Sequence, residues 1–375
     1  MRVSVQRNAV TVTLHLRPGK LRALRTRNKL FPYFQLQVRY PSRKSHVRRQ
    51  RAIPPTVPFP CEDAVSWGRS PQRPTSVHRL RPGDIDVVAA IGDSLVAGSG
   101  ALEEFALGAF VEYRGVSWCA GGDASWREYL TLPNILKEFN PNLRGYSTGT
   151  GEWLTRNAQF NVAFPVASDE DALKQRDPKN DWKMITVFIG ANDLCSASCL
   201  NPVSWSPAAH AKKLAKALDY LHKHLPRTIV NLVPVLGKFP TNQPKLLRTK
   251  NTSFFLVFSG RYDTREDFTV LVQPFMRLFN APLPPTRPLP LVIHQSYITH
   301  DCFHFSQKGH ALAANLLWNN LLEPVGNKSD NVPPVLLRSF RCPTRQAPFL
   351  FTARNSREFL RSGKQDGADD VYLEN

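Results

Sequence analysis

Residues 87–100, with the sequence VVAAIGDSLVAGSG, end an apolar run with a serine that could act as a nucleophile. Ser94 follows Gly-Asp, and several small residues come directly after it. A serine hydroxyl attacks a carbonyl carbon when a neighbouring base takes its proton. The small residues allow a sharp turn and a close approach of a substrate. On its own, the stretch also fits an ordinary serine in a turn.

A second stretch, residues 188–195 with the sequence FIGANDLC, places Asn192 and Asp193 directly after another apolar run. An asparagine amide at the end of a strand can donate a hydrogen bond to the negative oxygen that develops during acyl transfer. The alternative interpretation is an Asx turn that ends the strand.

The third stretch, residues 300–310, reads HDCFHFSQKGH and contains Asp301 and His304 three residues apart. In a turn, this spacing lets the carboxylate accept a hydrogen bond from His304 Nδ1. Nε2 is then left to take a proton from a serine. His300 and His310 are the competing histidines, which we interpret as a surface residue and a helix residue.

The elements that must position these residues follow from the apolar pattern. Buried parallel strands are predicted over residues 85–92, 182–190 and 227–236, with a less regular fourth run over 289–296. Ser206-Pro207 and Ser306 are typical helix starts with leucines at helical spacing behind them. The alternation predicts an α/β fold, a three-layer α/β/α sandwich with a mainly parallel sheet and flavodoxin-like architecture. Ligands of such sheets bind beyond the carboxyl ends of the strands, where Ser94 and Asn192 both lie.

Together, the three motifs occur in an order that resembles the GDSL or SGNH hydrolases, and in particular their membrane-associated phospholipase B branch. The resemblance extends with gaps from about residue 56 to residue 356. It implies an SGNH-hydrolase-like fold and ester hydrolysis through an acyl-enzyme, without a metal or cofactor. It also implies phospholipid or lysophospholipid substrates, with acylglycerols as further candidates. The stretches that carry it are SVHRLRPGDIDVVAAIGDSL, YRGVSWCAGGDASWREYLTLPNILKEFNPNLRGYSTGTG, DWKMITVFIGANDLC, SGRYDTREDFTVLVQPF and DCFHFSQKGHALAANLLWNNLLEPVG.

The same resemblance assigns roles to residues. The catalytic group would be Ser94 as nucleophile, His304 as base and then acid, and either Asp301 or Asp193 as the orienting carboxylate; the position of Asp301 so near His304 favours it. The oxyanion hole would combine the Ser94 backbone N–H, the Asn192 amide and the backbone N–H of Val166.

The chain departs from the family at Val166 and in three connectors. Val166 stands where the family has a glycine, and its β-branched side chain restricts the backbone there. Residues 169–181 replace a crossover helix of the family, and residues 237–260 and 281–299 also differ from it. An alternative function is therefore a catalytically impaired or non-catalytic lipase-like protein with a spoiled oxyanion hole.

Charge separates an N-terminal arm from the remainder of the chain. The 375 residues carry a formal net charge of +19, and residues 1–55 contain 14 Lys and Arg but no Asp or Glu. Such an arm can bind anionic lipid or nucleic acid, act as a targeting peptide, or be a leader without function. Nucleic acid is not an expected partner, because no basic patch with interleaved aromatic residues occurs in the globular part. We predict a disordered leader over 1–55, a linker over 56–80, the hydrolase-like domain over 81–326 and a loosely ordered tail over 327–375.

The cysteine spacing and the apolar runs give information about the cellular compartment of the chain. Cys195 and Cys199 have a spacing compatible with a small disulfide loop. The sequence contains no apolar run of 18 residues and no compact apolar segment typical of a signal peptide. The family resemblance nevertheless implies secretion or the outer face of the plasma membrane, with a membrane surface as partner. The sequence leaves the oligomeric state open.

Overall fold

The computed structural model of the chain describes residues 2–6, 9–13, 45–165, 180–193, 206–235, 257, 259–279, 294–330, 336–337, 339–362 and 368–371. Contacts divide the chain into two units, Met1–His46 and Val47–Asn375. In the first unit, β1 (Arg2–Gln6) and β2 (Ala9–Thr13) pair as an antiparallel hairpin, which differs from the predicted disordered leader. The second unit begins nine residues before the predicted start of the linker, because the Gln50 side chain is buried among backbone groups of residues 126, 127 and 130.

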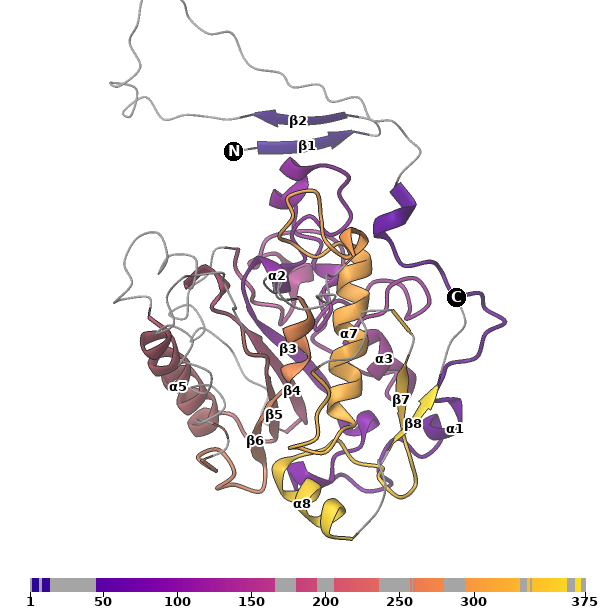
Figure 1. Ribbon diagram of the computed structural model, residues 1–375, viewed down its shortest axis with the longest axis vertical. Coiled ribbons are helices and arrows are strands. Elements are labelled where there is room, and N and C mark those ends of the chain that lie inside the picture. The colour runs from indigo at the N-terminus through magenta and orange to yellow at the C-terminus, as the bar shows by residue number, and fades with distance from the viewer. Residues whose placement is uncertain are drawn as a thin grey trace, which may run out of the picture. The chain divides into compact units, whose positions relative to one another are not determined.

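A four-stranded parallel sheet forms the centre of the second unit (Figure 1). Its strands lie in the order β3 (Val87–Gly92), β4 (Lys183–Phe188), β5 (Thr228–Leu232) and β6 (Phe268–Val272), and every residue in them is buried. The first three strands confirm the predicted runs. The fourth prediction is wrong where it can be compared: residues 289–293 lie outside the described residues, and residues 295–296 begin a 3-10 helix, Gln295–Tyr297.

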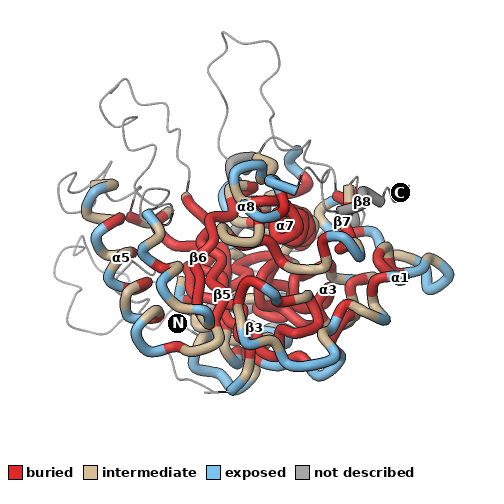
Figure 2. Tube along the Cα trace, turned by 90° about the horizontal axis from the view of Figure 1, so that it is seen from below, coloured by how far each residue is buried: buried red, intermediate tan, exposed pale blue. Residues whose placement is uncertain are grey.

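Helices cover both faces of this sheet, as the three-layer prediction requires. On one face α5 (Pro207–His224) packs Leu214 and Leu218 against Ile91 and its neighbours. On the other face α2 (Ser94–Ala97), α3 (Leu132–Phe139) and α7 (Gln307–Leu321) pack against the side chains that alternate with these along the strands. Figure 2 shows the strands as a buried layer between α5 and the group of α3 and α7. The predicted helix starts are confirmed, since Ser206 and Ser306 cap α5 and α7.

The segments before and after the sheet pack together, contrary to the predicted linker and tail. Within residues 56–80, Phe59 and Leu80 are buried in the same core cluster as Phe340 and Leu350 of the C-terminal region. A disulfide between Cys61 and Cys342 joins the two segments across 281 residues of sequence. The helices and strands of these two segments are α1 (Glu62–Val65), β7 (Phe340–Pro343), α8 (Ala353–Arg361) and β8 (Ala368–Val371).

Further 3-10 turns in the described part of the chain are Ser45–Arg48, Val77–Arg79, Pro82–Asp84, Ala106–Phe110, Arg114–Val116, Arg156–Ala158 and Pro274–Phe279.

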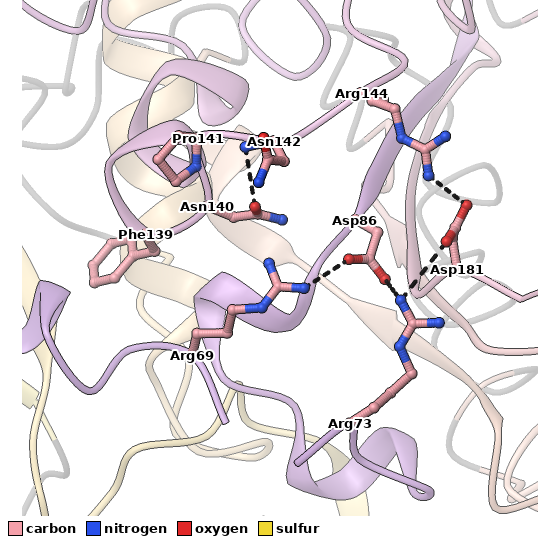
Figure 3. A pocket seen from close by; sticks show the side chains of 9 residues that line it. All are labelled: Arg69, Arg73, Asp86, Phe139, Asn140, Pro141, Asn142, Arg144 and Asp181. Atoms are coloured by element: carbon pink, nitrogen blue, oxygen red, sulfur yellow. Dashed lines mark hydrogen bonds and ion pairs between the residues drawn. The ribbon is translucent and has the colours of Figure 1, made fainter. Parts of the chain in front are cut away.

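A cluster of ion pairs closes the amino-terminal edge of the sheet (Figure 3). Asp86, just before β3, accepts hydrogen bonds from Arg69 Nη2 at 3.1 Å and Arg73 Nη2 at 2.9 Å. Asp181, just before β4, accepts one from Arg144 Nη2 at 2.6 Å. With residues 139–142 these side chains line a cavity of about 350 Å³. Arginines and carboxylates thus fasten the segment around residues 69–73 to the start of the sheet.

Several predictions fall on residues that the structure does not describe. The proposed Cys195–Cys199 disulfide, most of the replaced crossover at 169–181, and nearly all of residues 237–260 lie outside the described residues. None of the helices within the described ranges is both long enough and apolar enough to cross a bilayer.

Candidate active site

Ser94 lies where β3 turns into α2, at the carboxyl edge of the sheet. Asp93 is the helix cap: its Oδ1 accepts a hydrogen bond from the Leu95 N–H at 3.0 Å, and Ser94 is the first residue of the helix. The turn requires glycine at position 92, because a Cβ there would lie 2.4 Å from the Val96 side chain and 2.6 Å from the Phe188 carbonyl oxygen. Ser94 is 8% exposed, so its hydroxyl lies at the surface of the core rather than in a mobile loop.

His304 reaches Ser94 from a turn just before α7. Its Nε2 lies 2.8 Å from Ser94 Oγ, and its Nδ1 lies 2.5 Å from Asp301 Oδ2. The hydrogen-bond pattern predicted from the Asp-x-x-His spacing is therefore present. The hydroxyl, the imidazole and the carboxylate form one continuous chain across 210 residues of sequence.

Asp301 is held by four donors. Its carboxylate accepts hydrogen bonds from Thr299 Oγ1, the backbone N–H groups of Phe303 and His304, and the His304 ring. Partial burial acts to raise the pKa of Asp301, but the hydrogen bonds from Thr299 and His304 outweigh it and lower the pKa to about 2. A carboxylate this acidic stays ionised at neutral pH and fixes the imidazole with Nε2 toward Ser94.

The second acidic candidate, Asp193, occupies a different environment. Its side chain is buried, and its Oδ1 lies 4.0 Å from Lys213 Nζ on α5. Burial, foremost, and the charge of Asp193 raise the pKa of Asp93 to about 7, against the opposing hydrogen bond from the Leu95 N–H. Asp193 therefore influences the residue before the serine, while Asp301 is the carboxylate bonded to His304. The sequence left both aspartates open, and this geometry favours Asp301.

Asn192 leaves the same edge of the sheet as Ser94. Strand β4 pairs with β3 so that Phe188 lies opposite Gly92, and Asn192 follows Gly190 within the helical residues 191–193. Gly190 has φ +120°, and a Cβ there would lie 2.5 Å from the His210 ring, so this turn too depends on glycine. Asn192 is half-buried, with a side chain positioned at the strand exit. Val166, the third expected oxyanion donor, lies outside the described residues.

The other two histidines of the motif serve different purposes. His300 is exposed, and its Nε2 lies 3.0 Å from Arg48 Nη1. His310 is fully buried in α7, and its Nδ1 accepts a hydrogen bond from the Trp118 N–H at 3.3 Å. Burial, and secondarily the charge of His304, lower the pKa of His310 to about 3. A histidine that stays neutral beside a backbone donor is a packing residue, and its position within a helix agrees with the expectation of a surface or helix histidine.

Sequence reasoning missed Arg114, whose guanidinium organises the segment beside the site. The side chain is completely buried and ion-paired with Glu112. It donates to the carbonyl oxygens of Gly151 at 2.7 Å, Asn161 at 2.9 Å and Ala163 at 2.6 Å. This segment continues alongside β3, where the Phe164 N–H donates to the Gly92 carbonyl. Arg114 lies in a stretch that carries the family resemblance, but nothing in the local sequence shows which carbonyl groups it contacts, so only the fold reveals this role.

A serine, an imidazole and an ionised carboxylate in one hydrogen-bonded chain define the class of serine acylhydrolases. Residues 88–317 match the family described as GDSL-like Lipase/Acylhydrolase, and the chain belongs to that family. Among curated proteins it is similar to "Phospholipase B1, membrane-associated" of Homo sapiens, with 41% identity over 76% of this chain and 22% of the relative. The proteins of the same name from Mus musculus and Rattus norvegicus are 40% and 41% identical, each over 79% of this chain and 23% of the relative.

The chain thus spans less than a quarter of the length of these relatives. No solved structure shows a significant match to it. The family assignment and the α/β fold agree with the expectations drawn from the three motifs.

Proposed function

We propose that this protein is a serine ester hydrolase of phospholipase B or lysophospholipase type, with Ser94 as nucleophile, His304 as base and Asp301 as orienting carboxylate. The observation that carries the proposal is the continuous chain from Ser94 Oγ through both nitrogens of His304 to Asp301. Positioned nucleophile, base and orienting group are what acyl transfer requires.

The reaction follows from this geometry. His304 Nε2 takes the Ser94 proton as Oγ attacks the ester carbonyl carbon. The negative oxygen of the tetrahedral intermediate would be stabilised by the Ser94 N–H and the Asn192 amide, with the Val166 N–H as a third donor. His304 then gives its proton to the leaving alcohol, and the acyl group stays on Ser94. Water, deprotonated by the same imidazole, releases the fatty acid and restores the serine.

Lipid esters are the proposed substrates, because the relatives are named as phospholipases and as membrane-associated. We propose phospholipids or lysophospholipids, with acylglycerols as further candidates, and a membrane or micelle surface as the place of reaction. An oxidising compartment outside the cytosol is supported by the Cys61–Cys342 disulfide, since such bonds persist in secreted proteins.

The test compares the full chain with Ser94→Ala on two substrates, a water-soluble short-chain ester and lysophosphatidylcholine micelles. Ser362→Ala, at an exposed serine that ends α8, is the matched control. We expect hydrolysis of both substrates by the unmodified chain and the control, and a loss of at least about 10³-fold in Ser94→Ala. Equal activity of Ser94→Ala and the control would contradict the assignment. Val166→Gly in the same assay measures the effect of the departure from the family: a faster variant would show that valine limits the rate.

A further inference from the structure

Exposed apolar side chains are concentrated around the Ser94–His304 pair. Eight large apolar side chains are exposed among the described residues, and five of them lie on three loops at the carboxyl edge of the sheet. We call these five the apolar rim: Leu107, Phe110, Leu154, Phe164 and Phe303. Single exposed apolar residues are ordinary on soluble proteins, but a concentration at one place marks an interaction site.

Phe303 and Phe164 adjoin the catalytic residues directly. The Phe303 ring packs edge-to-face on the His304 ring with centroids 5.0 Å apart, and its side chain is 52% exposed. The Phe164 N–H donates to the carbonyl of Gly92, two residues before Ser94. Trp153 packs edge-to-face against Phe164 with centroids 6.0 Å apart, which places Leu154 next to the same segment.

Leu107 and Phe110 project from the loop that follows α2. The base of this loop is closed by hydrogen bonds between Gly98 and Tyr113 and between Gly100 and Val111. It abuts the start of α7, because the Gln307 N–H donates to the Ala101 carbonyl at 2.8 Å. Figure 1 shows the ends of β3 and α2 at the same end of the molecule as the start of α7. Phe110, at 66% exposed, therefore stands beside the entrance to the site.

Some of the charged and polar side chains near the rim have partners within the protein. Arg49 pairs with Glu104, and the Tyr113 hydroxyl donates to Glu103. Arg48 donates to the Ile298 carbonyl on the loop that carries His304. The rim itself consists only of exposed phenylalanines and leucines, which suits a partner surface without net charge. Aromatic and leucine side chains on loops insert into the interface of a bilayer, where the ester groups of phospholipids lie.

We propose that the apolar rim docks this protein on a zwitterionic lipid surface and presents Ser94 to ester groups at that surface. This inference rests on the proposed function and adds the docking surface. Insertion of Leu107 and Phe110 into the lipid interface removes their apolar area from water, which favours docking. Docking would therefore weaken in steps as rim residues are replaced, while the chemistry at Ser94 would not change.

The experiment uses the full chain with the double substitution Leu107→Ser and Phe110→Ser. The control carries Tyr220→Ser and Leu360→Ser, which likewise replace an exposed aromatic residue and an exposed leucine, here on α5 and α8. Co-sedimentation with phosphatidylcholine vesicles measures docking, and hydrolysis of a water-soluble short-chain ester measures the chemistry. We expect vesicle partitioning of the rim variant to fall at least about tenfold, with ester hydrolysis within about twofold and the control unchanged.

Three results would overturn the docking proposal. The first is vesicle binding by the rim variant that equals that of the control. The second is binding only to anionic vesicles that vanishes with added salt, which would assign it to basic residues. The third is a changed oligomeric state of the rim variant on size exclusion with unchanged vesicle binding, which would make a second copy of the chain the occupant. Failure of the proposed function is separate, because it appears as absent hydrolysis of the soluble ester by the unmodified chain.

Discussion

The two edges of the parallel sheet both carry charged side chains at strand ends, yet they are built differently. At the amino edge, Asp86 and Asp181 lie between arginines, and each carboxylate has a guanidinium partner within 3.1 Å (Figure 3). At the carboxyl edge, Asp301 has a histidine as its partner, and the far nitrogen of that histidine meets a serine hydroxyl. One arrangement ends in neutralised charge, and the other ends in a group that can give up a proton.

The ion pairs at the amino edge therefore have a structural role, whereas the groups at the carboxyl edge can react. Arginine stays protonated at any pH that a protein tolerates, so the amino-edge pairs cannot move a proton. A histidine imidazole can accept and release a proton in the physiological pH range. Asp301 orients the His304 ring so that Nε2 faces the Ser94 hydroxyl. A cavity with many charges does not mark the candidate active site here, because the cavity of about 350 Å³ lies among the ion pairs of the amino edge.

The largest effect is expected from removing the charge that orients His304. Asp301→Asn should lower kcat on a soluble ester by about 10⁴-fold, since the wrong imidazole tautomer is then favoured. Asp193→Asn, at the other candidate acid, should lower kcat less than about tenfold in the folded protein and act mainly on stability. Steady-state kinetics and thermal unfolding of both variants measure the two effects. The reverse ranking of kcat losses would make Asp193 the catalytic acid.

A large effect on stability is expected from Arg114. Arg114→Met leaves the partly buried Glu112 without its partner and three carbonyl oxygens without a donor, which should cost about 3 kcal/mol in the free energy of unfolding. Below the unfolding transition, kcat should fall about tenfold with little change in KM, because the segment beside β3 shifts. Arg156→Met, at an exposed arginine of the same region, is the control and should change neither quantity. Equal unfolding free energies in both variants would contradict this role for Arg114.

Asp93 should give a pH-dependent effect of intermediate size. Its pKa of about 7 lies above the ordinary 3.8, so between these values the folded protein holds a proton that the unfolded chain releases. Stability from this residue is therefore fully present below about pH 4 and declines as the pH rises to about 7. Asp93→Asn keeps the helix cap and should flatten this decline, each pKa unit corresponding to about 1.4 kcal/mol. Urea unfolding at several pH values compares the two chains, and parallel curves would show that Asp93 ionises normally.

The smallest effect is expected at the amino edge. Arg144→Ala removes an arginine whose side chain is 63% exposed, and such pairs contribute about 0–1 kcal/mol. Activity on a soluble ester should stay within about twofold, because the site lies at the other edge of the sheet. A loss of activity without a loss of stability would show that the two edges are coupled and that the contrast drawn between them is wrong.

Sequence alone predicted the site motifs and three of the four strands, because both are encoded locally. Apolar runs such as residues 87–92 mark strands that are buried on both faces, and Asp301 and His304 lie within one turn. The FTVLV run of β6 was overlooked in favour of residues 289–296, since two short apolar runs cannot be ranked without their partners. Contacts distant in sequence were also hidden: Cys61 with Cys342, and Arg114 with the Asn161 and Ala163 carbonyls. The choice of Asp301 over Asp193 likewise needed the hydrogen bond to His304.

The central claim is that Ser94 is the nucleophile activated by His304, and covalent labelling tests it most directly. A fluorophosphonate probe is added to the folded full chain, and the adduct is located by mass spectrometry of its peptides. We expect one adduct on Ser94, no adduct in Ser94→Ala, and labelling slowed by at least about 10³-fold in His304→Gln. A folded chain that stays unlabelled, or one whose adduct lies on another serine, would contradict it.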